Sequence, residues 1–178
     1  KSRAELLART DSLTGVASRR ALLEAGTTEL LRARRYSRPF SVIMLDIDHF
    51  KHVNDSYGHA GGDQVLIELA ARLLNQLRET DHVGRMGGEE FAVLLPEAGP
   101  SDAFHFTERL RAVVEATHFE LADTKLQVTA SFGVATLSDT DADIDALLHR
   151  ADLALYQAKR AGRNRVMMSR PEPENIER

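Results

Sequence analysis

The chain has 178 residues, of which 43% are hydrophobic, and its formal net charge is −4. This length suits one globular domain, which can bury about 70% of the surface of the unfolded chain. The slightly acidic charge gives no electrostatic case for a nucleic-acid polymer as partner. The chain has no cysteine, which excludes disulfides and fits a reducing compartment. No hydrophobic run approaches the ~20 residues that cross a bilayer, so we expect a cytoplasmic domain.

The two ends of the chain differ from its middle. Residues 1–10 look like the end of a helix that arrives from an upstream signalling segment, such as a sensory or receiver domain. The sequence leaves open whether that upstream part contains a membrane anchor. Residues 170–178 are polar and contain two prolines, which predicts a disordered tail. Residues 11–169 are therefore expected to form the folded domain.

Helices and strands are expected to alternate in the first half of the domain. Ser18 can cap a helix that runs to about Tyr36. Residues 40–47 form a hydrophobic, β-favouring run that predicts a strand. Hydrophobic residues then recur at helical spacing, which predicts an amphipathic helix over about 61–78.

The second half is expected to contain a tight hairpin and three further elements. Two short hydrophobic runs flank Gly87 and Gly88, a pattern typical of strand, turn and strand. The later elements are a helix from Pro100, a strand over 126–135, a helix over 144–158 that ends near Gly162, and a short strand over 166–168. Interleaved helices with one tight hairpin favour an α+β, ferredoxin-like fold, in which helices flank a mainly antiparallel sheet.

Two groups of carboxylates follow these predicted strands. Asp46 ends the strand over 40–47, and Glu89 and Glu90 follow the two glycines of the hairpin. Acids at the end of a buried strand cost desolvation energy unless they have a partner such as a metal. If the two strands are neighbours, Asp46 and Glu89 converge, and such a pair suits Mg²⁺ or Mn²⁺. The alternative is an exposed acid pair. Asp48 is expected to have a structural role.

Several of these motifs together resemble the GGDEF family, the diguanylate cyclases. The resemblance extends from DSLTG at 11–15, through DIDHFK at 46–51 and RMGGEEF at 85–91, to GRNR at 162–165. It implies a palm-like sheet of the nucleotidyl cyclase type. The chain departs from the family pattern at Met86, Ser18 and Glu89. Glu89 replaces an aspartate and keeps its charge, so no ligand is lost.

The resemblance also implies the reaction. Two GTP would become cyclic di-GMP and two pyrophosphates across a symmetric homodimer, with one GTP held by each domain. Two Mg²⁺ or Mn²⁺ ions per active site would be held by Asp46, the carbonyl of Ile47 and Glu89. Glu90 would assist at the metals or support the turn.

Further residues match the family's GTP contacts. The backbone around Phe50, in a short loop after the acids, would cradle phosphates, and Lys51 would place a positive charge on them as a catalytic group. Asn54 and Asp63 would read guanine, since an amide donates and accepts while a carboxylate accepts. The remaining contacts implied are His59, Lys159 and Arg163. Lys159 and Arg163 are four residues apart and share a face if the last helix persists that far.

These GTP contacts also have structural explanations. Asn54 suits a turn, Asp63 suits the first turn of a helix, and His59 could cap that helix. Lys159 and Arg163 could simply complement the dipole of the last helix.

A regulatory site is implied by the segment RETD at 78–81. In the family, an arginine and an aspartate at the positions of Arg78 and Asp81 form an inhibitory site for the product, cyclic di-GMP. Arg109 is expected to contribute from a neighbouring surface. The structural alternative is an ion pair at a helix end, which stabilises little.

Two other functions are weighed against a GTP cyclase. One is a binding module that senses GTP or cyclic di-GMP through Arg78 and Asp81, which the intact acids argue against. The other is a palm-type cyclase that uses ATP, against which Asn54 and Asp63 argue.

Overall fold

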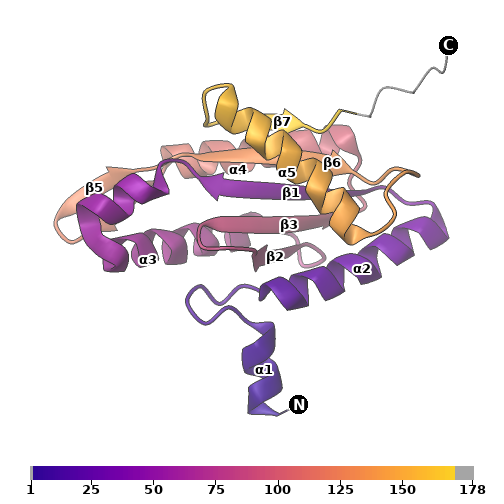
Figure 1. Cartoon of the computed structure of the whole chain (residues 1–178), viewed down its shortest axis with the longest axis horizontal. Helices are drawn as coiled ribbons and strands as arrows, with labels where there is room; N and C mark the ends of the chain where they lie inside the picture. The colour runs from indigo at the N-terminus through magenta and orange to yellow at the C-terminus, as the bar shows by residue number, and fades with distance from the viewer. Residues whose placement is uncertain (1, 171–178) are drawn as a thin grey trace.

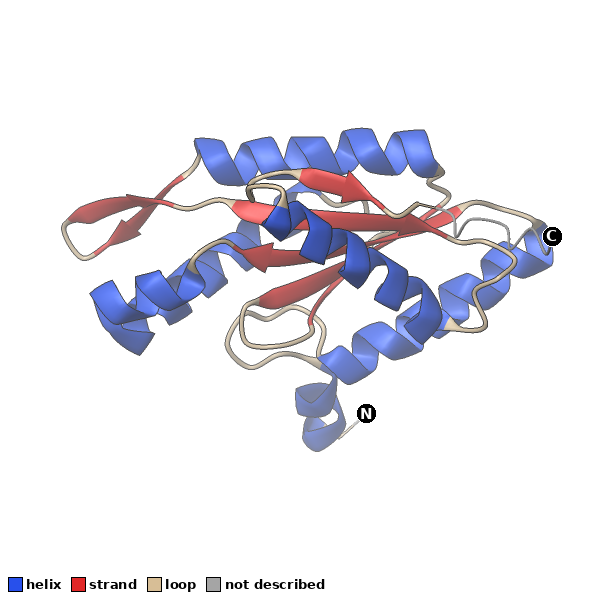
Figure 2. Cartoon of the chain, turned by 45° about the horizontal axis from the view of Figure 1, so that its top comes forward, coloured by secondary structure: helices blue, strands red, loops and turns tan. Residues whose placement is uncertain are grey.

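The computed structural model describes residues 2–170, in which a five-stranded sheet carries helices on both faces (Figures 1 and 2). The predicted tail therefore lies outside the described residues except for Arg170. In chain order the elements are α1 (Arg3–Arg9), α2 (Arg19–Tyr36), β1 (Phe40–Ile47), α3 (Phe50–Gln76), β2 (His82–Arg85), β3 (Glu90–Pro96), α4 (Pro100–Ala116), β4 (His118–Leu121), β5 (Thr124–Gln127), β6 (Ala130–Thr136), α5 (Ile144–Arg160) and β7 (Val166–Met168).

The sheet is mainly antiparallel, as the sequence predicts. Its strand order is β2-β3-β1-β6-β7, and only the β6–β7 pair is parallel. β1 lies at the centre, and all eight of its residues are buried. The α+β class with a central sheet between helices is therefore confirmed.

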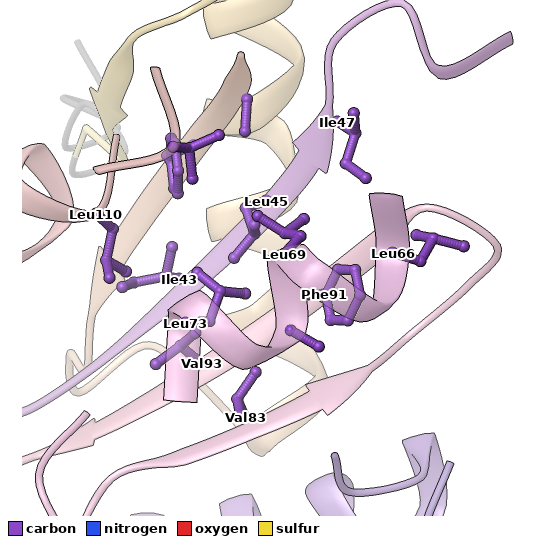
Figure 3. Packing of buried hydrophobic residues seen from close by; sticks show 14 of the residues in the cluster. Ile43, Leu45, Ile47, Leu66, Leu69, Leu73, Val83, Phe91, Val93 and Leu110 are labelled. Carbon is purple, nitrogen blue, oxygen red and sulfur yellow. The ribbon is translucent and has the colours of Figure 1, made fainter. Parts of the chain in front are cut away.

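Alternate side chains of β1 pack into two hydrophobic cores, one on each face of the sheet. Val42 and Met44 belong to the core under α2 and α5. Ile43 and Leu45 point the other way, toward residues of α3 such as Leu69 (Figure 3). Because side chains of a strand alternate between faces, β1 is fixed in register from both sides. The end of β1 that carries Asp46 is therefore held in place.

Several predicted helix boundaries are confirmed. The Ser18 hydroxyl accepts a hydrogen bond of 3.2 Å from the N–H of Ala21 and caps α2. Pro100 is the first residue of α4. Gly162 follows the C-terminal cap of α5 with a φ of 127°, a conformation that favours glycine.

The helix predicted over about 61–78 matches only the second part of α3, and the first part was not predicted. The helix begins at Phe50 and not near residue 61, and it is interrupted at Gly58, whose φ is 73° and ψ is 176°. Figure 1 shows its two parts running in different directions. The first part buries only Phe50 and Val53, so its hydrophobic pattern is too short to signal a helix.

The single strand predicted over 126–135 is in fact two strands. β5 ends at Gln127 and pairs with β4 in a separate two-stranded sheet, while β6 begins at Ala130. Between them, Thr129 turns toward β1: its carbonyl accepts a 2.9 Å bond from the N–H of Asp48. β4 was not predicted, because a four-residue strand carries little periodicity.

The N-terminal segment is attached to the edge of the sheet. α1 is followed by a loop in which Thr10 bridges Ala17, and Ala17 bridges Gly84 of β2. The origin of α1 in an upstream signalling segment stays a prediction. Among the described residues, no helix combines the length and the hydrophobicity needed to cross a membrane.

Candidate active site

The pairing of β1 with β3 brings the predicted acids together. Asp46 stands directly opposite Glu90 in the antiparallel register, and Glu89 immediately precedes β3. Asp46 is buried, whereas the other two carboxylates are partly exposed. Three carboxylates therefore gather at one end of two central strands.

Arg85 holds the two-glycine turn in shape. Its guanidinium donates hydrogen bonds to the carbonyl of Gly87 at 3.1 Å and to that of Gly88 at 2.8 Å. It also pairs with Asp11 at 3.4 Å, whose carboxylate accepts from the N–H of Thr14. The DSLTG segment and the turn that positions Glu89 are thus connected through one arginine.

Burial and mutual repulsion raise the pKa of all three acids. Burial raises the pKa of Asp46 most, and Asp48 and Asp152 add to it, although the ammonium of Lys159 opposes the shift. Burial and the nearby Asp46 carboxyl raise the pKa of Glu89. Burial also raises the pKa of Glu90, with contributions from Asp152 and Asp46. Such a cluster favours binding of a cation.

Lys159 provides a positive charge at this cluster. It lies in the last turn of α5, and its ammonium donates a hydrogen bond to Oδ2 of Asp46. This ion pair joins residues 113 positions apart in the chain. The structure therefore places Lys159 at the acids, where it could also meet the phosphates of a nucleotide.

The donor set fits a hard divalent cation held jointly with a nucleotide. Within residues 2–170, no group of three or more Asp, Glu or His side chains has the geometry of a metal site formed by protein alone. Mg²⁺ typically binds through one or two carboxylates, waters and substrate phosphates. Asp46 and Glu89 supply such carboxylates, and Ile47 follows Asp46 at the end of β1.

Phe50 and Lys51 do not lie in a loop, contrary to the prediction. His49 caps α3 with a φ of 56°, and Phe50 and Lys51 form the first turn of this helix. The turn forms because the N–H groups of His52 and Val53 bond back to the carbonyl of His49. N–H groups at the start of a helix lack intrahelical acceptors and attract anions, so a phosphate-binding role remains compatible with this geometry.

The predicted base-reading residues lie on the two parts of α3. Asn54 is in the first part and is partly buried. His59 directly follows the interruption at Gly58, and Asp63 lies one turn further on. Both are exposed. The Gly58 interruption therefore sets how these three side chains face one another.

Arg163 does not share a helical face with Lys159, because the last helix does not persist to residue 163. α5 ends at Arg160, and the chain then turns through Gly162 and Arg163, whose φ is 63°. Left-handed residues end the helix, and Arg163 is exposed on the following loop.

Asp48 accepts hydrogen bonds from Thr129, Ser131 and the N–H of Asn164, as expected of a structural residue.

Two residues near the acids were missed by the sequence analysis. Asp152 is exposed and raises the pKa of Asp46 and Glu90. Its spacing of seven residues from Lys159, two helical turns, is a signal that places both on one side of α5. Arg19 donates a 3.2 Å hydrogen bond to the carbonyl of Met86 and lowers the pKa of Glu90. No pattern in the sequence around Arg19 predicts that it lies near the acids.

Comparison with known proteins identifies the family of the chain. A family model described as the diguanylate cyclase GGDEF domain matches residues 8–165. The chain belongs to the GGDEF family. It is 43% identical over 157 residues to the diguanylate cyclase DgcP of Pseudomonas aeruginosa, a match that covers 88% of this chain and 23% of DgcP. It is 42% identical over 163 residues to the response regulator PleD of Caulobacter vibrioides, covering 90% of this chain and 36% of PleD.

A solved structure has the same fold. The GGDEF domain of DgcB from Caulobacter crescentus, in complex with c-di-GMP, is similar with a TM-score of 0.87 and 34% identity, covering 92% of this chain and 94% of that chain. By contrast, the chain spans only 23% and 36% of the length of DgcP and PleD. Those curated relatives therefore contain much that lies outside this GGDEF domain.

The predicted inhibitory site lies beside a cavity of about 300 Å³ between α4 and the end of β3. Arg78 and Arg109 both line it, so Arg109 lies at the same cavity and not on a neighbouring surface. The side chain of Asp81 is fully buried and accepts three hydrogen bonds from Arg78. Arg109 stacks on the ring of Phe106 at 5.1 Å. In this arrangement Asp81 orients Arg78, and both arginines line the cavity.

The raised pKa values predict how metal ions affect stability. A carboxyl whose pKa is raised by folding destabilises the native state once it ionises, so its penalty disappears as the pH falls through that pKa. Mn²⁺ binds the ionised form and should raise the Tm at neutral pH, less so in acid. Glu89→Gln should raise the metal-free Tm and weaken the response to Mn²⁺. Differential scanning fluorimetry measures both.

The matched control is Glu79→Gln, the same change at an exposed position in the turn after α3. It should leave the Mn²⁺ response intact. An equal rise in Tm with Mn²⁺ in both variants would show that Glu89 does not bind the metal.

Proposed function

We propose that this GGDEF domain is a diguanylate cyclase that condenses two GTP into cyclic di-GMP and two pyrophosphates. The observation that carries this proposal is the convergence of Asp46, Glu89 and Lys159 at one end of β1 and β3. An acid pair and an ammonium are the charges that a metal-bound triphosphate requires. GTP is a cytoplasmic nucleotide, so we place the domain in the cytoplasm.

The proposed chemistry is an in-line displacement at phosphorus. The 3′-oxygen of one GTP attacks the α-phosphate of the other, the bond to pyrophosphate breaks, and the hydroxyl proton leaves to solvent or a nearby base. Mg²⁺ or Mn²⁺, two per site, would neutralise the attacking and leaving oxygens. Asp46, Glu89 and the carbonyl of Ile47 would hold these ions. Lys159 would then exchange its Asp46 partner for a phosphate.

The other contacts would position the nucleotide. The first turn of α3, with Phe50 and Lys51, faces the end of β1 and offers N–H groups and a cation to the phosphates. Asn54 and Asp63 would read the guanine edge, and His59 would add a contact. Arg163 lies on the loop that follows α5, four residues after Lys159, and would add a contact to GTP from there. Catalysis would come chiefly from positioning and charge neutralisation.

The stoichiometry of the proposed reaction requires a homodimer. One domain holds one GTP, whereas the product contains two nucleotides, so two domains must meet face to face. An upstream sensory or receiver domain would control this encounter. Turnover per molecule that rises with protein concentration would support this step, and turnover that stays constant down to monomeric concentrations would contradict it.

The activity itself is tested by incubating the protein with GTP and Mg²⁺ and identifying the product by mass spectrometry. Cyclic di-GMP should form. Asp46→Asn and Glu89→Gln should each slow turnover by about 100-fold or more, because each removes a charge that stabilises the transition state. Glu79→Gln should remain active. Full activity in either acid variant would refute the metal assignment, and equal use of ATP would refute guanine recognition.

We also propose product inhibition through the Arg78–Arg109 cavity. Guanidinium groups bind phosphate or the guanine edge bidentately, and bound product would hold two domains with their GTP sites apart. Arg109→Ala should weaken cyclic di-GMP binding about tenfold in calorimetric titration, with little change in Tm. Arg78→Ala should weaken binding and also destabilise by about 1–3 kcal/mol, because buried Asp81 loses its partner.

The two variants separate regulation from structure. Unchanged affinity for cyclic di-GMP in Arg109→Ala would show that the cavity is not the product-binding site. A loss of stability in Arg78→Ala without a loss of affinity would reduce Arg78 and Asp81 to a structural ion pair.

A further inference from the structure

The interruption of α3 brings two distant parts of this helix into contact. Asn54 and Gly62 are eight residues apart, which would separate them by about 12 Å along a straight helix. Yet a Cβ atom placed on Gly62 would lie 1.9 Å from Oδ1 of Asn54 and 3.0 Å from its Cγ. The turn at Gly58 folds the first part of α3 back (Figure 1). The Asn54 amide therefore occupies the space that a side chain at position 62 would fill.

Gly62 is needed for space and not for backbone freedom. It is buried within the second part of α3 and is not among the glycines with positive φ, which are Gly15, Gly58 and Gly162. Glycine inside a helix is less favourable than alanine, so a packing reason must offset its presence. The nearest atoms are side-chain ends: Oδ1 of Asn54 and, at 3.1 Å, Cζ of Phe50.

We infer that Gly62 is a positioning residue for guanine recognition, because its missing side chain leaves room for the amide of Asn54 against the helical turn that carries Asp63. This inference rests on the proposed function. Asp63 directly follows Gly62 in the second part of α3, so the contact brings the Asn54 amide to the helical turn that carries Asp63. Together they offer donors and acceptors that match the amide edge of guanine and not the edge of adenine.

A methyl group at position 62 separates this role from a role in folding. Gly62→Ala would displace the ends of two side chains, while alanine favours the helix more than glycine does. The fold should therefore survive, with a Tm equal to or above that of the unaltered protein. The amide of Asn54, however, would leave its place against position 62.

The test measures binding of non-hydrolysable GTP and ATP analogues with Mg²⁺ by calorimetry. Gly62→Ala should bind the GTP analogue about tenfold more weakly, the loss expected for one base-reading hydrogen bond, with binding of the ATP analogue unchanged. Asn54→Ala should show the same loss. The double variant should be no weaker than Asn54→Ala alone, because both changes remove one interaction.

Gly61→Ala is the matched control. It adds the same methyl group one position earlier, where the Cβ would meet Cβ of Tyr57 at 2.5 Å and not Asn54. Its Tm should fall, whereas its preference for the GTP analogue should stay within about twofold of the unaltered protein. An equal loss of preference here would mean a general distortion of α3 and would overturn the role of Gly62.

The remaining outcomes distinguish this inference from the proposed function. A preserved GTP preference in Gly62→Ala, or additive losses in the double variant, would overturn only the positioning role. An unaltered protein that binds both analogues equally would overturn guanine recognition itself.

Discussion

The antiparallel register of β1 and β3 places Asp46 opposite Glu90, and the chemistry of the domain depends on this pairing. β1 cannot slip, because alternate side chains fill hydrophobic cores on both faces of the sheet. The register therefore brings the carboxylates of Asp46, Glu89 and Glu90 close together, at a place where burial raises the pKa of each acid. Such an arrangement costs stability in the free protein and favours a cation, as expected of a functional site.

The opposing positive charge depends on close packing elsewhere. Lys159 reaches Asp46 because α5 lies directly on β6, where a Cβ atom on Gly133 would be 2.1 Å from the carbonyl oxygen of Ala151. A glycine in the middle of a strand thus sets the height of a helix above the sheet. That height determines whether the last turn of α5 can deliver its ammonium to the acids. The site is consequently a product of packing on both faces of the sheet.

The sequence predicts what local patterns encode and misses what tertiary contacts decide. Long periodic segments such as α2 and α5 and the hydrophobic run of β1 were correctly predicted, and the acids lie where the strand and turn motifs place them. The first part of α3 was missed because only two of its residues are buried. The ion pair between Lys159 and Asp46 spans 113 positions, and the charge that Asp152 adds to the acids depends on how α5 crosses the sheet. The spacing of Asp152 and Lys159 places them on one side of α5, but no local pattern shows that this side faces the acids.

The most direct test of this account is anomalous diffraction from crystals grown with Mn²⁺ and a non-hydrolysable GTP analogue. We expect Mn²⁺ to be bound by the carboxylates of Asp46 and Glu89 together with nucleotide phosphates, and the ammonium of Lys159 to have moved from Asp46 to a phosphate. Anomalous signal absent from these acids, with nucleotide bound and the ion pair between Lys159 and Asp46 intact, would contradict it.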